Sequence, residues 1–321
     1  MSATKCFSHG PQRFRPLADN DLSQNTPSAV MYSGIIYCLR CMISSDIPLN
    51  QGCLTPIEVY CPPKTLLSPS LEAATVGSNV ETSQRIVDLI FKAFRACAAS
   101  QGTCNNLTFG YGGTDPETGN IVKGFGYYET IAGGAGAGPG WNGQSGVHTH
   151  ITNTRITDPE TFEKRYPVIL REFSIRTGTG GAGFYRGGDG CVRDIELTRP
   201  MQVSILSERR VIPPYGMAGG CDAARGRNIW VRKDLKNGSE RYISLGGRAT
   251  TMMNPGDRII VQTPGGGGYG KDPHAEEEFV PPEELEILKR SKIATNGLAN
   301  GSSAFRANGS VAEREVVGAS N

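Results

Sequence analysis

Two of the chain's four histidines stand two positions apart, His148 and His150 in the segment VHTHITNT. Residues 147–154 predict a strand, in which the side chains at positions i and i+2 point to the same side. Two imidazoles on one side can contact one metal ion or one substrate oxygen, and imidazole titrates near neutral pH. Surface exposure or hydrogen bonding is the alternative role. The spacing supplies no third ligand, so we predict no metal site.

A glycine-rich run, GGAGAGPG at 133–140, precedes these histidines, and two further clusters occupy 178–190 and 264–270. Glycine allows backbone N–H groups to approach an anionic or oxyanionic group closely. It equally allows tight crossings between strands, with no role in binding. The sequence leaves both roles open.

Two glycine patterns resemble nucleotide-binding motifs but fail on the residues that follow them. Residues 178–183 fit G-x-G-x-x-G, yet the FYRGG after them cannot open the helix that would receive a pyrophosphate. Residues 265–271 fit G-x-x-x-x-G-K, but Asp272 stands where a Ser or Thr would hold Mg²⁺, and its charge repels phosphate. We therefore predict that this chain binds no cofactor by itself.

The composition excludes several classes of protein. The net charge is +2, without the basic excess typical of phosphate-backbone binding, so we expect no nucleic-acid partner. No apolar stretch approaches the roughly 18 residues of a membrane span, and we expect no membrane partner. Nine cysteines without a secretion signal predict reduced thiols and a cytoplasmic location. The CxxC at Cys38 and Cys41 lies on an apolar helix, which favours core packing.

Hydrophobic periodicity predicts an α+β fold, a β-rich single unit with Gly-rich loops and one long buried helix. That helix spans Asn79–Ser100, because Ile86, Ile90 and Phe94 recur at helical spacing. We also expect helices at 27–44 and at 158–166, the second capped by Asp158. The β-type runs are 52–68, hairpins within 108–131, 147–154, 169–176, 192–197, 202–206, 228–232, 242–245 and 258–261.

The domain organisation follows from these elements. Residues 1–24 match no element, residues 25–271 form the folded unit, and residues 272–321 predict a short charged helix followed by a disordered tail.

Residues 25–270 resemble the hydantoinase B/5-oxoprolinase family, and specifically the C-terminal part of an ATP-dependent 5-oxoprolinase. Eight blocks in the same order carry this resemblance. They are DIPLNQGCLTPIEVYCP, LLSPS, VGSNVETSQRIVD, ASQGTCNNLTFG, YYETIAGGAGAG, GVHTHITNTRITDPETFEKRYPV, REFSIRTGTGGAGFYRGGDG and PGGGGYG.

The resemblance implies a cytoplasmic enzyme of glutathione turnover that opens the cyclic amide 5-oxoproline to glutamate with ATP and Mg²⁺. In that family a hydantoinase A-like portion handles ATP, and the complete enzyme is expected to be a homo-oligomer. The sequence lacks an A-like portion and the upstream Asp/His-rich segments expected to hold metal. We therefore expect a C-terminal piece that is inactive alone and needs an A-like portion or chain.

Opening an amide ring requires an acid–base group and donors for a developing oxyanion. We expect His148, His150 and Glu129 as catalytic residues. Backbone N–H groups of Gly133, Gly134 and Gly136, together with Asn153, are the expected substrate contacts. Two alternatives remain open: a non-catalytic truncated paralogue acting as an interaction or structural protein, and a hydantoinase B subunit that needs a separate A chain.

Overall fold

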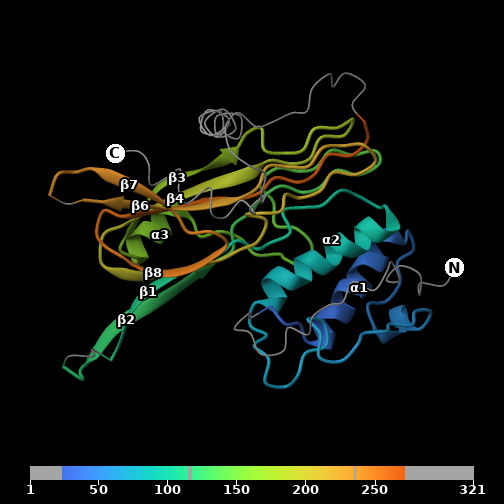
Figure 1. Ribbon diagram of the computed structural model, residues 1–321, viewed down its shortest axis with the longest axis horizontal. Coiled ribbons are helices and arrows are strands. Elements are labelled where there is room, and N and C mark those ends of the chain that lie inside the picture. Colours follow the sequence, from blue (N-terminus) through green and yellow to red (C-terminus); the bar gives the residue numbers. More distant parts are fainter. Residues whose placement is uncertain (1–23, 115–117, 235, 272–321) are drawn as a thin grey trace, which may run out of the picture.

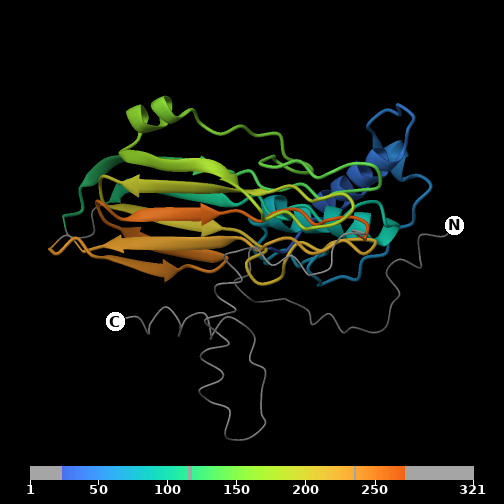
Figure 2. The same ribbon diagram turned by 90° about the horizontal axis from the view of Figure 1, so that it is seen from above.

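The computed structural model describes residues 24–114, 118–234 and 236–271. The segment expected to be unplaced (1–24, except Gln24) and the expected charged helix and tail (272–321) lie outside the described residues. Strands gather at one end of the molecule and helices α1 and α2 at the other, with long irregular segments running between them (Figures 1 and 2).

Nine strands form two antiparallel sheets in the described part of the chain. The four-stranded sheet has the order β2-β1-β5-β8, and the five-stranded sheet has the order β3-β4-β9-β6-β7. The strands are β1 (Asn106–Thr114), β2 (Ile121–Glu129), β3 (Val168–Arg176), β4 (Gly190–Leu197), β5 (Met201–Leu206), β6 (Arg227–Lys233), β7 (Glu240–Ser244), β8 (Arg248–Met253) and β9 (Arg258–Gln262).

A single apolar core lies between the two sheets. Alternating side chains point inward from both, so that Phe109 of β1 and Val203 of β5 meet Ile195 of β4 and Ile259 of β9. The short helix α3 (Pro159–Arg165) adds Phe162, which is fully buried. These sheets and this core are called the sandwich below.

The helical end has a second core between α1 (Ser28–Met42) and α2 (Ser83–Phe94). Helix α2 buries Ile86, Val87, Ile90 and Phe91 against α1. A π-helical turn, η3 (Ser78–Thr82), leads into α2, and a 3-10 turn, η2 (Gln51–Leu54), follows α1.

Between the sandwich and α2 lie four extended, irregular segments, called the glycine bundle here: 133–146, 177–189, 213–224 and 264–270. They hydrogen-bond to one another outside regular strands, for example from Gly188 N to Ala135 O and from Gly181 N to Gly266 O, both at 2.9 Å. The segments approach so closely that a Cβ on Gly134 would lie 2.1 Å from Gly188 O. Side chains cannot fit there, and this explains the glycine clusters.

The structure confirms the α+β, β-rich fold with glycine-rich loops. The helices expected at 27–44 and 158–166 are confirmed, and Asp158 caps the second by accepting from Glu160 N and Thr161 N. The long helix is shorter than predicted, because Arg95 turns into the left-handed region (φ 55) directly after Phe94. The strands predicted within 52–68 and 147–154 are wrong, and β8 was missed.

Candidate functional site

The segment 147–154 is irregular, and its only ladder contact is the bridge from Val147 to Gly133. His150 has φ 56, in the left-handed region that residues other than glycine seldom adopt. The carbonyl of Thr149, which a strand would pair with a neighbouring backbone, instead accepts from the side chain of Gln84 at 3.0 Å. The expectation that His148 and His150 share a strand face is therefore wrong.

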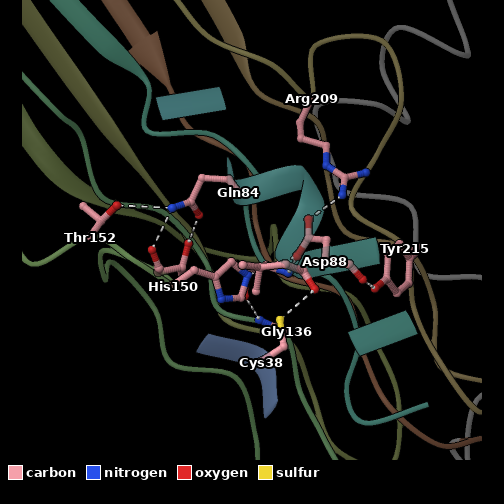
Figure 3. A network of polar contacts seen from close by, with 11 residues as sticks. Cys38, Gln84, Asp88, Gly136, His150, Thr152, Arg209 and Tyr215 are labelled. Atoms are coloured by element: carbon pink, nitrogen blue, oxygen red, sulfur yellow. Dashed lines mark hydrogen bonds and ion pairs between the residues drawn. The ribbon is translucent and has the colours of Figure 1, made fainter. Parts of the chain in front are cut away.

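The imidazole of His150 is held in the molecule's interior against α2. Its Nε2 lies 3.2 Å from Oδ1 of Asp88, and the two side chains are 7% and 3% exposed. The ring of Tyr37 from α1 and that of Phe91 from α2 flank it, with centroids 6.0 and 5.8 Å away. Figure 3 shows the His150 side chain, from the segment 147–154, pointing toward Asp88 of α2.

Both oxygens of the Asp88 carboxylate accept hydrogen bonds. Oδ1 also accepts from Ser100 N at 3.1 Å, and Oδ2 accepts from Arg209 Nη2 at 2.7 Å. The Arg209 side chain is 3% exposed, so this is a buried ion pair. Gly102, at φ 61, leaves room for it, since a Cβ there would lie 2.7 Å from Arg209 Nε and 2.8 Å from Asp88 Oδ2.

Asp88 belongs to a row of buried polar residues that continues from η3 into α2. Glu81, Gln84 and Asp88 are spaced three and four apart, which places them on one face of the helical segment. All three are 3% exposed or less. We call them the polar row. Sequence reasoning followed only the apolar periodicity of this helix, although the same i, i+3, i+7 spacing of polar residues was available to reveal a second buried face.

Gln84, at the centre of the polar row, ties the histidine segment to α2. Its amide nitrogen donates to Thr149 O and, at 3.2 Å, to Thr152 Oγ1. Its carbonyl oxygen accepts from Thr149 Oγ1 at 3.1 Å. Figure 3 shows this exchange beside the Asp88–His150 contact. The segment that carries the two histidines is therefore fixed by side chains rather than by a strand ladder.

Glu81 begins the polar row and is fully buried. Thr103 donates to its Oε1 at 2.9 Å, while Oε2 is enclosed without a hydrogen-bond partner among the described residues. Burial raises the pKa of Glu81 to about 8, against the opposing effects of Thr103 and Arg210. Burial also lowers the pKa of Arg210 to about 9. A carboxyl group that titrates near neutral pH in the interior is suited to holding or transferring a proton.

His148 stands apart from this network. It is half-buried, and burial lowers its pKa. Its Nδ1 is enclosed without a partner, and no hydrogen bond or ring contact joins it to His150 in the part of the chain that the structure describes.

Glu129 lies in the sandwich rather than beside the histidines. Its carboxylate accepts two hydrogen bonds from the fully buried Arg193, at 3.0 and 2.9 Å, and a third from Tyr127. The carboxylate that contacts His150 is Asp88, which the sequence analysis did not single out.

The expected oxyanion donors are already engaged within the chain. The N–H groups of Gly133, Gly134 and Gly136 donate to Val147 O, Pro264 O and Ser100 Oγ at 3.0 to 3.1 Å. Because these N–H groups have internal partners, the structure gives these glycines a packing role in the glycine bundle. Asn153 is exposed at the surface of the histidine segment.

Several other motifs have structural roles. Cys38 is buried in the α1–α2 core, as predicted, whereas Cys41 is exposed.

No three His, Cys, Asp or Glu side chains within the described residues cluster closely enough to hold a metal ion. Over the same residues, the search for a helix long and apolar enough to cross a bilayer found none.

Residues 19–272 match the profile of the hydantoinase B/oxoprolinase family, and the chain belongs to that family. It is 55% identical to the 5-oxoprolinase of Saccharomyces cerevisiae over 254 residues and 54% identical to 5-oxoprolinase 1 of Arabidopsis thaliana over 248 residues. Each match covers 77% of this chain but only 19% and 18% of those proteins. The chain thus spans about a fifth of the length of these relatives.

Other matches are more distant in sequence. A putative D-/L-hydantoinase B-type subunit of Pseudomonas sp. is 25% identical over 262 residues, covering 80% of this chain and 43% of that protein. Two solved structures share the fold: acetone carboxylase (TM-score 0.63, 17% identity, 88% of this chain and 46% of that one) and the ATP-dependent caprolactamase of Pseudomonas jessenii (TM-score 0.56, 21% identity, 82% and 45%).

Proposed function

We propose that this chain is the C-terminal, hydantoinase B-like part of an ATP-dependent 5-oxoprolinase-type enzyme, which opens the cyclic amide 5-oxoproline to glutamate. The observation that carries the proposal is the identity of 54–55% with two 5-oxoprolinases over about 250 residues. In this proposal the enzyme acts in the cytoplasm, in glutathione turnover, and the complete enzyme is a homo-oligomer.

The proposed division of labour leaves ATP and Mg²⁺ to a hydantoinase A-like portion or chain. The described glycine clusters support this, because they pack against one another in the glycine bundle instead of opening a helix toward a phosphate. The chain alone is then inactive, and it contributes groups to the amide-opening side of the reaction.

His150 is the residue to which we assign acid–base chemistry, with His148 as a second candidate. Amide opening needs a group that takes up and returns a proton near neutral pH, and imidazole is suited to that task. His150 is supported by its buried contact with the Asp88 carboxylate. His148 has a lowered pKa, which favours the neutral form that acts as a base.

A chimera tests the proposal directly. Residues 25–271 would replace the matching segment of the Saccharomyces cerevisiae 5-oxoprolinase, and glutamate release from 5-oxoproline would be measured with and without ATP. We expect ATP-dependent glutamate release from the chimera and none from the isolated chain. A folded chimera that releases no glutamate contradicts the proposal, as does ATP-coupled turnover by the isolated chain.

The match to the hydantoinase protein of Pseudomonas favours a second candidate, a B-type subunit that acts with a separate A chain. The chimera distinguishes the two when it is supplied with 5-oxoproline and with a hydantoin in parallel. Preference for the hydantoin supports the subunit role. No turnover of either substrate supports the remaining alternative, a non-catalytic interaction or structural protein.

A further inference from the structure

We propose that Asp88 is a positioning residue: it holds His150 with the proton on Nε2, which leaves Nδ1 free to exchange a proton with the substrate, while Arg209 balances the charge of Asp88. The catalytic part of this inference rests on the proposed function. The positioning part concerns this chain alone and is tested separately.

The hydrogen bonds of the Asp88 carboxylate indicate which nitrogen of His150 carries the proton. Asp88 accepts from Ser100 N and from Arg209 Nη2, so both oxygens already serve as acceptors. His150 Nε2, 3.2 Å from Oδ1, must then be the donor. In a neutral imidazole the other ring nitrogen is an acceptor. Nδ1 has no partner in the described part of the chain and is not one of its fully enclosed polar atoms.

The surroundings of the ring are mostly aromatic. On two sides His150 meets the rings of Tyr37 and Phe91, and its contact with each of them is a ring contact. Two further polar side chains lie beside Asp88: the Cys38 thiol donates to Val87 O, and the Tyr215 hydroxyl donates to the backbone oxygen of Asp88. Asp88 is therefore the only carboxylate in contact with His150 among the described residues.

The backbone conformations around Asp88 support the same assignment. His150 and Arg209, the two side chains that converge on Asp88, both have left-handed φ angles, 56 and 61. Such conformations cost free energy in residues other than glycine, and they persist at sites where geometry serves function. Gly102 lies beside the same ion pair, where a Cβ would collide with both partners. Three backbone positions thus accommodate one carboxylate and its partners.

The nearest precedent in chemistry is the buried aspartate that orients a catalytic histidine. There, the carboxylate fixes which ring nitrogen carries the proton, and its replacement by an amide leaves the wrong tautomer. A purely structural link between α2 and the loop needs only a hydrogen bond, whereas positioning requires one particular tautomer. The tautomer of His150 therefore distinguishes a structural role of Asp88 from a positioning role.

The test is ¹⁵N NMR of the histidine side chains in this chain, above the pH at which imidazole is protonated. The His150 signals are assigned by their disappearance in His150→Gln. We expect the Nε2–H tautomer in the wild type and loss of that fixed preference in Asp88→Asn. Asp189→Asn is the matched control, since Asp189 is an equally buried carboxylate that accepts from Thr179 N and Gly180 N in the glycine bundle.

Two results overturn the positioning role: an Nδ1–H tautomer of His150 in the wild type, or an unchanged Nε2–H tautomer in Asp88→Asn. If Asp88→Asn does not fold, the tautomer of His150 in the wild-type spectrum decides. In the active chimera, Asp88→Asn should lower kcat at least tenfold with little change in KM. A fixed tautomer together with unchanged kcat would leave the positioning intact and overturn its catalytic use.

Discussion

The sandwich and the interface between α2 and the glycine bundle are stabilised by opposite means. In the sandwich, apolar side chains from two sheets are buried together, and the backbone follows regular ladders. At the α2 interface, the glycine bundle brings backbones into direct contact, and Glu81, Gln84 and Asp88 bury polar groups beside it. The first arrangement gains free energy from apolar burial. The second carries the desolvation cost of buried polar groups.

This difference supports the proposed assignment of chemistry to the α2 interface. The carboxyl and amide groups of the polar row, with the imidazole of His150 and the guanidinium of Arg209, are buried at a desolvation cost. Replacing buried polar groups of this kind with apolar residues often stabilises a fold. Loop residues outside the glycine bundle enclose this site, because Ser100, Gly102 and Arg209 approach Asp88 from neighbouring loops. We therefore regard the sandwich as the scaffold and the polar row as the part that carries chemistry.

The largest expected effect is at Gly134. A Cβ there would lie 2.1 Å from Gly188 O and 2.3 Å from Gly266 N, both of them backbone atoms that cannot rotate away. We expect Gly134→Ala to lower the free energy of unfolding by more than about 4 kcal/mol or to prevent folding. Urea unfolding followed by circular dichroism measures this.

Gly126→Ala is the control for Gly134→Ala. Gly126 lies in β2, where a Cβ would meet no atom within 4 Å, and its φ is not positive. We expect less than about 1 kcal/mol for this change. If both variants unfold at the same urea concentration, close backbone contact is not what the glycines provide.

The sandwich is expected to respond as an apolar core. Ile195 is fully buried between the sheets, and Ile195→Ala should lower the free energy of unfolding by about 3 kcal/mol through lost burial and the cavity left behind. Ile121→Ala, at a side chain 84% exposed on β2, should cost less than about 0.5 kcal/mol. Equal costs at the two sites would remove the distinction between core and surface on which the comparison depends.

The next expected effect is a pH dependence of the free energy of unfolding, caused by Glu81 in the polar row. The pKa of Glu81 is raised from 4.5 to about 8, so between these values the folded state binds more protons than the unfolded state. The free energy of unfolding should therefore fall as pH rises through this window, by up to about 1.4 kcal/mol per pH unit from this group. Glutamine does not titrate, so Glu81→Gln removes this contribution to the pH dependence.

Denaturant titrations of wild type and Glu81→Gln at pH 5, 6 and 7 measure this difference. We expect the variant to gain about 2 kcal/mol relative to the wild type between pH 5 and pH 7. A stability difference that is constant over this range would show that Glu81 is ionised in the folded protein at pH 5 as it is in the unfolded chain.

The strands of the sandwich could be predicted from the sequence, and the partners of the polar row could not. Strands β3, β4, β5 and β9 follow runs of alternating or apolar residues, and the cap at Asp158 follows a local rule. Such signals are local, so they can be read from a short window of sequence.

The site depends on contacts between residues far apart in the chain. His150 meets Asp88 across 62 positions, and Arg209 meets Asp88 across 121. The alternation in VHTHITNT predicted a strand, but Gln84 supplies the hydrogen bonds that a neighbouring strand would have supplied. The spacing of residues cannot show which distant partner a segment will contact, so the sequence did not indicate the contact between His150 and Asp88.

The assignment of acid–base chemistry to His150 is tested most directly by the turnover number of the chimera carrying His150→Gln. Glutamine keeps an N–H that can donate to Asp88 but does not titrate, so the variant removes the proton transfer while retaining the contact. At matched folding, shown by an unchanged melting temperature, we predict at least a tenfold fall in kcat, about 1.4 kcal/mol of transition-state stabilisation. A kcat within twofold of the unmodified chimera would contradict the claim.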